Sequence, residues 1–112
     1  MKRYSLTLNL KNDAELIREY EDHHKAVWPE IISSIKDAGI SNMQIYRYGI
    51  RLFMIMEVND DFSFEKKQHA DTNNTKVQEW EELMWKYQQP LVGTAKGEKW
   101  ILMDKIFELK EF

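Results

Sequence analysis

Two apolar segments, residues 42–48 and 51–58, are separated by only Gly49 and one further residue. The first (NMQIYRY) alternates polar and apolar side chains, and the second (RLFMIMEV) is apolar enough for a central strand. A glycine between two such segments is typical of a β-hairpin. This hairpin limits the fold more than any other feature, because the remaining elements must pair with it or cover it.

Before the hairpin, the sequence predicts one strand and one or two helices. Residues 4–10 (YSLTLNL) alternate strictly, as in a half-buried strand. Asn12-Asp13 offers a helix N-cap, and a helical spacing of side chains then runs from Leu16 to Val27. Pro29 either ends this helix or restarts the chain as the first residue of a second one.

The second helix is expected over residues 30–38, with Gly39 just past its end. After the hairpin, the pattern predicts a short helix over residues 64–70, a longer one from residue 75 to about 88, and a last strand over residues 99–109. Residues 59–62, 71–74 and 93–97 are expected to be loops or turns.

The expected order is therefore β, α(α), β, β, α, β. This is the split βαβ plan of ferredoxin-like α+β domains, with an antiparallel sheet covered by helices on one face. The length of 112 residues predicts a single domain, residues 1–112. The open face of the sheet must pack against a second copy or line a ligand pocket.

The composition excludes several classes of function. With 16 basic and 19 acidic side chains and no basic stripe, neither nucleic acid nor an anionic membrane is an expected partner. The chain has no cysteine, which excludes disulfides and thiolate metal sites. No apolar segment approaches the ~20 residues of a membrane span, and charges come too early for a secretory signal. We therefore expect a cytoplasmic protein.

The candidate chemistry lies in residues 20–30 (YEDHHKAVWPE). Tyr20 and His24 are four residues apart, so a helix would place both on one face, where a phenol and an imidazole can bind a polar molecule and move its protons. His23 would point about a hundred degrees away. A buried tyrosine beside a rim histidine on an ordinary amphipathic helix would give the same pattern.

Other candidates carry a weaker signal. The three histidines show no metal-ligand spacing, so no metal site is expected. Trp80 fits either a cleft or the core, and Glu81 beside it fits a solvated helix face. The 4 Trp, 5 Tyr and 5 Phe fit a core and dimer interface, or a sugar-binding cleft in which aromatic faces stack on the ligand.

The pattern Tyr20-x-x-x-His24-x-x-Val27-Trp28-Pro29-Glu30-Ile31 resembles the L-rhamnose mutarotase family, and the likeness covers nearly the whole chain. The resemblance implies a homodimeric α/β-barrel enzyme that interconverts the anomers of a 6-deoxyhexose, L-rhamnose or L-fucose, without metal or cofactor. It assigns His24 as the general acid/base. The expected sugar-binding set is Tyr20, Trp28, Met43, Tyr46, Trp80 and Glu81.

Two positions depart from the rhamnose-specific pattern. Met43 stands where that group has a tyrosine, and Glu81 replaces the second of two tandem tryptophans. These departures leave the choice between L-rhamnose, L-fucose and another sugar open. Two rival functions also remain: a cofactor-free or haem-dependent monooxygenase on the same barrel, and a non-catalytic sugar-binding module.

Overall fold

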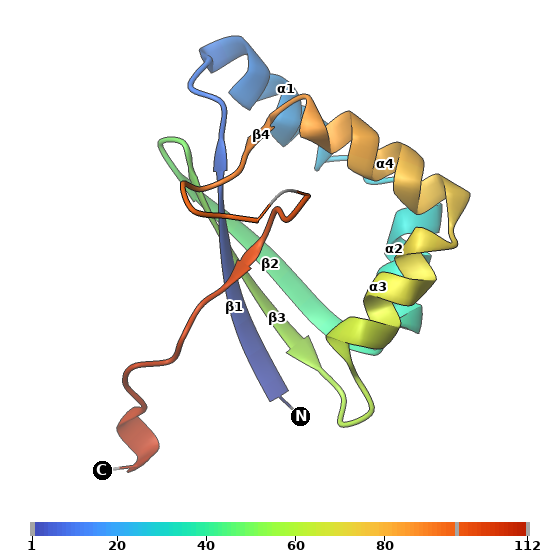
Figure 1. Cartoon of the computed structure of the whole chain (residues 1–112), viewed down its shortest axis with the longest axis vertical. Coiled ribbons are helices and arrows are strands. Elements are labelled where there is room, and N and C mark those ends of the chain that lie inside the picture. Colours follow the sequence, from blue (N-terminus) through green and yellow to red (C-terminus); the bar gives the residue numbers. More distant parts are fainter. Residues whose placement is uncertain (1, 96, 112) are drawn as a thin grey trace.

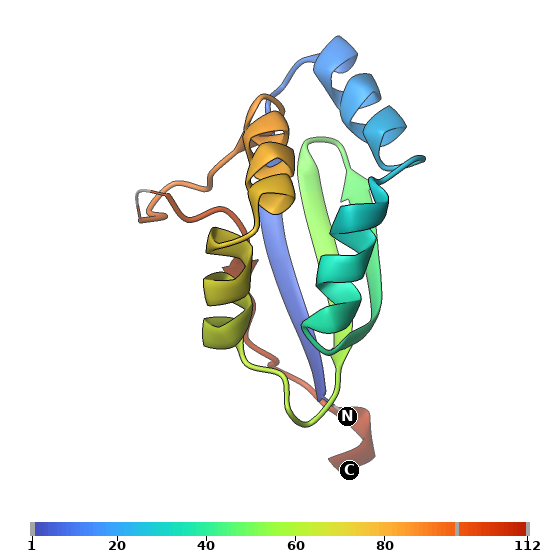
Figure 2. The ribbon, with the colours of Figure 1, turned by 90° about the vertical axis from the view of Figure 1, so that its right-hand side faces the viewer.

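The computed structural model describes residues 2–95 and 97–111, so Lys96, in the predicted loop 93–97, lies outside the described residues, as do Met1 and Phe112 at the ends of the predicted domain. The α-helices of the described residues cover one face of an antiparallel sheet (Figures 1 and 2). The elements are, in chain order, β1 (Lys2–Leu10), α1 (Ala14–His23), α2 (Pro29–Asp37), β2 (Ile40–Tyr48), β3 (Arg51–Val58), α3 (Phe64–Thr72), α4 (Thr75–Trp85), β4 (Gln88–Gln89), β5 (Ile101–Leu102) and the 3₁₀ turn η1 (Leu109–Glu111).

The sheet order is β2-β3-β1-β4, and β5 also pairs with β1. The predicted hairpin is present: β2 and β3 are antiparallel neighbours, joined at Gly49, whose φ of 59° suits glycine. In the centre, Leu8 of β1 lies opposite Leu52 of β3. All pairings are antiparallel, which confirms the expected α+β, ferredoxin-like plan.

The core lies between the helices and the inner face of the sheet. Leu8 and Val58 are fully buried there, because alternate residues of each strand point toward the helices. Two clusters of buried side chains fill this layer, one under α1, α2 and α4 and the other at the end of the sheet where β2 begins. Ile35, Ile45 and Trp100 pack against both clusters and join them.

The outer face of the sheet carries no helix in Figure 1. Tyr46 and Tyr48 on β2 are 55% and 89% exposed, and Phe53 and Ile55 on β3 are only half-buried. The C-terminal segment that follows β5 runs away from the sheet and exposes further apolar side chains, including Ile106 and Phe107. The expected open face is therefore present in this chain.

The predicted end of the first helix was wrong, whereas the start of the second was one of two predicted possibilities. The first helix ends at His23 rather than near Val27. Trp28, the residue before Pro29, has a non-helical ψ of 137°, as a residue that precedes a proline favours. The second helix begins at Pro29, which takes the predicted place of its first residue, and Gly39 follows its C-cap with φ of 94°, as predicted. This φ favours glycine, and a Cβ at Gly39 would also lie 2.7 Å from Asn59 Oδ1, so the Asn59 side chain would have to shift.

The last helix and the last strand also differ from expectation. Helix α4 ends at Trp85, not near Gln88, because Gln88 and Gln89 pair with β1 as β4. The expected strand over residues 99–109 shrinks to Ile101–Leu102. Its start is limited because β4 already pairs with Asn9 and Leu10 of β1, and after Leu102 the chain leaves the sheet. Long-range pairing decides both limits, and a single-sequence pattern does not record it.

Candidate functional site

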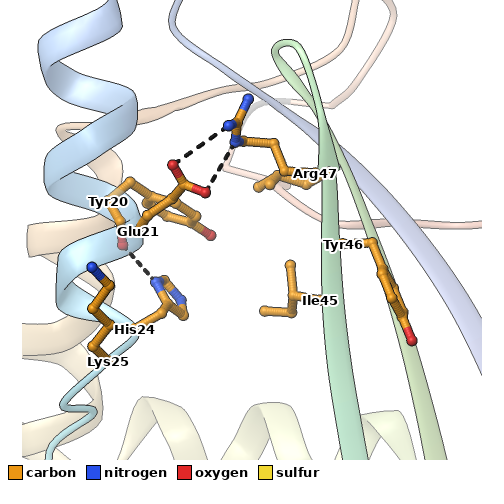
Figure 3. A pocket seen from close by; sticks show the side chains of 8 residues that line it. Tyr20, Glu21, His24, Lys25, Ile45, Tyr46 and Arg47 are labelled. Carbon is orange, nitrogen blue, oxygen red and sulfur yellow. Dashed lines mark hydrogen bonds and ion pairs between the residues drawn. The ribbon is translucent and has the colours of Figure 1, made fainter.

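A cavity of about 290 Å³ lies between the end of α1 and strands β2 and β3 (Figure 3). Helix α1 and the turn after it provide one wall, and the hairpin provides the other. The residues that line the cavity are Tyr20, Glu21, His24, Lys25, Ile45, Tyr46, Arg47 and Leu52. The predicted Tyr20–His24 pair thus faces a pocket, with an apolar floor from the hairpin and charged side chains at its margin.

The end of helix α1 fixes the orientation of the His24 ring. The backbone N–H of His24 donates to the carbonyl of Glu21, which leaves the Tyr20 carbonyl available as an acceptor at the helix C-terminus. His24 Nδ1 lies 2.8 Å from that oxygen. A carbonyl oxygen only accepts hydrogen bonds, so Nδ1 carries the proton and, in the neutral ring, Nε2 keeps a lone pair.

The environment of His24 favours the neutral ring. Burial lowers its pKa below the ordinary value, while the bond to the Tyr20 carbonyl acts in the opposite direction and the neighbouring His23 adds to the lowering. The ring of Tyr20 packs against that of His24, with centroids 4.4 Å apart. The site therefore holds a neutral imidazole, with one nitrogen free, beside a phenol.

Tyr20 is the buried member of the pair. Burial raises the pKa of its hydroxyl to about 12; a hydrogen bond from Gln88 lowers it and the charge of Glu81 raises it further. The phenol is therefore protonated at neutral pH. Gln88 Nε2 lies 3.5 Å from the Tyr20 oxygen.

Trp80 and Trp28 stand beside the pair. The Trp80 ring lies edge-on to His24 at 5.8 Å and to Trp28 at 5.1 Å. Trp80 is only 7% exposed and belongs to the core cluster under α1, α2 and α4. Neither tryptophan lines the cavity directly, so both support the wall that carries His24.

The remaining predicted site residues lie farther from the pair. Met43 faces inward and packs against the cluster at the start of β2. Glu81 forms an ion pair with Lys99 at 2.7 Å and does not line the cavity. Tyr46 lines the rim, but its ring points away from the cavity in Figure 3 and its hydroxyl donates to Gln44 at 3.3 Å. The roles of all three stay predictions.

Sequence reasoning missed a charged pair at the cavity. Arg47 of β2 and Glu21 of α1 bridge the two walls, with Nε and Oε2 3.3 Å apart, and Arg47 also donates to the Gly49 carbonyl at 2.8 Å. The alternation that places Ile45 on the inner face places Arg47 there too. An arginine on an otherwise apolar strand face was the available signal.

His23 points elsewhere, as its place on the helix predicts. Its Nε2 lies 3.1 Å from the Tyr87 hydroxyl, which donates to Glu19 at 3.0 Å. Within residues 2–95 and 97–111, no group of three or more His, Cys, Asp or Glu side chains has the arrangement of a metal site. The same residues include no helix long and apolar enough to cross a membrane.

This arrangement suits proton exchange on a small hydroxylated molecule. A neutral imidazole with a free nitrogen removes a proton from a hydroxyl group, and the imidazolium that results returns it. A phenol beside it donates a hydrogen bond. Aromatic and charged walls of this kind are common around sugars, whose faces are apolar and whose edges are polar.

Comparison with known proteins supports the same class. A family model described as L-rhamnose mutarotase matches residues 3–109. An L-fucose mutarotase of Xanthomonas campestris is 42% identical over 99% of this chain and 90% of its own length. The crystal structure of an L-rhamnose mutarotase from Formosa agariphila has a TM-score of 0.72 at 22% identity, covering 96% of this chain and 98% of its own.

A second solved structure, a dimeric ferredoxin-like protein from an uncultured marine organism, has a TM-score of 0.54 at 15% identity and covers 86% of this chain and 98% of its own. At these identities the two structures support the fold alone, and they agree with the expected ferredoxin-like plan. The family match and the Xanthomonas relative confirm the enzyme class predicted from the sequence, a carbohydrate isomerase of the mutarotase type. The chain belongs to the L-rhamnose mutarotase family.

Proposed function

We propose that this protein interconverts the α and β anomers of a 6-deoxyhexose pyranose, with L-fucose as the preferred sugar. The observation that carries the mechanism is the 2.8 Å contact between His24 Nδ1 and the Tyr20 carbonyl, which leaves Nε2 free at the cavity. The 42% identity to an L-fucose mutarotase supports the choice of sugar.

In the proposed reaction, His24 Nε2 removes the proton of the anomeric hydroxyl. The bond between the ring oxygen and the anomeric carbon then breaks, the ring oxygen takes up a proton from the imidazolium, and an open-chain aldehyde forms. Rotation of the aldehyde followed by ring closure on its other face gives the second anomer. Every proton that His24 takes is returned, so the chemistry is complete with an imidazole alone.

Tyr20 supports this step as a hydrogen-bond donor to the sugar. Its hydroxyl stays protonated at neutral pH, since its pKa is about 12. Trp80 and Trp28 hold the wall that carries His24, and the Arg47–Glu21 pair presents charged atoms to sugar hydroxyls at the cavity margin.

Saturation-transfer NMR of anomer exchange tests the proposal, with L-fucose, L-rhamnose and D-galactose as sugars. We expect wild type to accelerate exchange of a 6-deoxy sugar and His24→Ala to lose about 10²–10⁴-fold of that acceleration, the usual worth of general acid/base catalysis. His69→Ala is the matched control, because His69 is exposed on α3, away from the cavity.

Each other result has a definite meaning. If exchange on a 6-deoxy sugar survives His24→Ala, the reaction stands but His24 is not its base. If no sugar exchanges faster with wild type, mutarotation is refuted. Sugar binding without acceleration would then favour the binding module, and a Soret band or oxygen uptake with a quinol would favour the monooxygenase.

We also propose that the protein is a homodimer in which the outer sheet face of one copy packs on that of another. Phe53 and Ile55 are half-buried there beside the exposed Tyr46 and Tyr48, and exposed apolar faces of this kind mark interfaces. A neighbour in fold is a dimeric ferredoxin-like protein. Light scattering after size exclusion should give twice the 13.5 kDa chain mass.

A charge on the outer face should split this dimer. We expect Phe53→Lys to give a monomer, whereas Lys76→Glu on the exposed side of α4 should leave the mass unchanged. A monomeric wild type, or a Phe53→Lys variant that stays dimeric, would contradict the proposed face.

We further infer that residues 1–112 form one domain that works in the cytoplasm. The two core clusters share Ile35, Ile45 and Trp100, so helices and sheet are packed as a unit. The cysteine-free sequence suits a reducing compartment. A single unfolding transition and recovery in the cytoplasmic fraction are the expected results.

A further inference from the structure

Gln88 is a buried polar side chain that the proposed mechanism does not yet use. It lies in β4, where it pairs with Leu10 of β1, and it is only 4% exposed. Its Nε2 lies 3.5 Å from the Tyr20 oxygen, and its Oε1 has no hydrogen-bond partner among the described residues. A buried amide that leaves its carbonyl unpaired lowers stability, so an apolar side chain would suit this position better as mere packing.

The contact with Gln88 favours one orientation of the Tyr20 hydroxyl. An amide N–H donates, so the Tyr20 oxygen uses a lone pair toward Gln88. The phenolic proton is then free for another acceptor, and Tyr20 lines the cavity together with His24. Without Gln88, nothing in the described surroundings of Tyr20 Oη would favour the orientation in which its proton points at a ligand.

Contacts other than Gln88 also hold the Tyr20 ring. The ring is 3% exposed, and it packs against the rings of His24 at 4.4 Å and Tyr87 at 6.0 Å. A change at residue 88 therefore alters the direction of the hydroxyl hydrogen bond and leaves the ring in place.

We propose that Gln88 is a positioning residue for the reaction: its amide N–H directs the Tyr20 hydroxyl to donate its proton to an oxygen of the bound sugar. This inference rests on the proposed mutarotase function and extends it to a residue that does not itself line the cavity. In the opposite orientation of the amide, Oε1 would take the phenolic proton and the sugar would meet a lone pair instead.

A double-mutant cycle tests the proposal with the same exchange assay. The variants are Gln88→Met, which keeps the length of the side chain, Tyr20→Phe, which keeps the ring, and the two combined. Gln89→Met is the matched control, because Gln89 is the exposed next residue of the same strand. Wild type and His24→Ala are measured in the same experiment. If wild type does not accelerate exchange, the proposed mutarotase function fails; if it does, the Gln88 variants test the role of Gln88 alone.

We expect Gln88→Met to lower kcat roughly three- to tenfold, the range of a single hydrogen bond. In the Tyr20→Phe background the same change should have no further effect, because the hydroxyl through which Gln88 acts is gone. Gln89→Met should match wild type. Thermal unfolding of Gln88→Met should occur at or above the wild-type temperature, since an unpaired buried amide has been removed.

Three results would overturn the proposal. The first is an unchanged kcat in Gln88→Met. The second is an equal loss in both backgrounds, which would mean that Gln88 does not act through the Tyr20 hydroxyl. The third is a loss that accompanies a lower unfolding temperature, which would assign Gln88 a structural role.

Discussion

The rate of anomer exchange should respond to pH in a direction that the surroundings of His24 determine. The proposed base acts as the neutral ring, and burial lowers its pKa below the ordinary value of about 6.5. As pH falls through 6.5, an unperturbed imidazole would already be half protonated and the enzymatic rate would fall with it. We therefore expect kcat/KM to hold through this range and to decline only at lower pH.

The size of the difference is large enough to measure. At pH 5.5 an imidazole with the ordinary pKa is neutral in about one molecule in ten. The protein should keep more than about a tenth of its plateau kcat/KM at that pH. Exchange NMR between pH 4.5 and 8, corrected at each pH for the spontaneous reaction, gives the profile.

A substitution at His23 tests whether the neighbouring charge contributes to the lowered pKa of His24. His23 contributes to the low pKa of His24, since its charge disfavours a second charge beside it. His23→Gln should therefore move the acid limb upward, toward 6.5, and Gln can keep a hydrogen bond to the Tyr87 hydroxyl. His69→Gln on α3 should leave the limb where it is. An acid limb at or above 6.5 in wild type would refute the assignment of His24 as a desolvated base.

Two substitutions test the charged contacts around the site. Lys99 donates to the Glu81 carbonyl at 3.0 Å and to its carboxylate at 2.7 Å, so Lys99→Met should lower the free energy of unfolding by about 1–2 kcal/mol. The control is Lys86→Met at an exposed position, which should change the free energy of unfolding by less than about 0.5 kcal/mol. Both variants are unfolded in urea at the same protein concentration, and equal effects of the two substitutions would contradict this reasoning. Arg47→Met breaks a partly exposed ion pair with Glu21, so the free energy of unfolding should change by under about 1 kcal/mol. The KM for the sugar should rise, and an unchanged KM would mean that Arg47 does not contribute to sugar binding.

The parts of the fold that sequence predicted are those with a local cause. The Asp13 N-cap is confirmed, since its carboxylate accepts from the N–H groups of Glu15 and Leu16. The alternation of β1 and the glycine of the hairpin likewise depend only on residues that are close in the sequence. The end of α4 and the length of β5 were wrong, because both depend on which strand shares the edge of β1.

The candidate site divides in the same way. Tyr20 and His24 are four residues apart on one helix, so their contact follows from helical geometry. Arg47 meets Glu21 across 26 residues of chain, and Gln88 reaches Tyr20 across 68. No periodicity connects such positions, and only the packing of the hairpin and β4 against α1 brings them together.

The surroundings of Met43 and Glu81, the two departures from the rhamnose-specific pattern, indicate what each side chain does in the structure. Met43 points inward and packs against the core cluster at the start of β2. Its flexible thioether side chain fills space in the core there and has no hydroxyl, whereas a tyrosine at this position would carry a phenol. The carboxylate of Glu81 pairs with Lys99 outside the cavity lining, and its charge contributes to the raised pKa of Tyr20. Neither residue lines the cavity, whereas Arg47 and Glu21 do. Discrimination between L-fucose and L-rhamnose, which differ in the orientation of their hydroxyls, is therefore expected to depend more on this charged pair than on the two substituted positions.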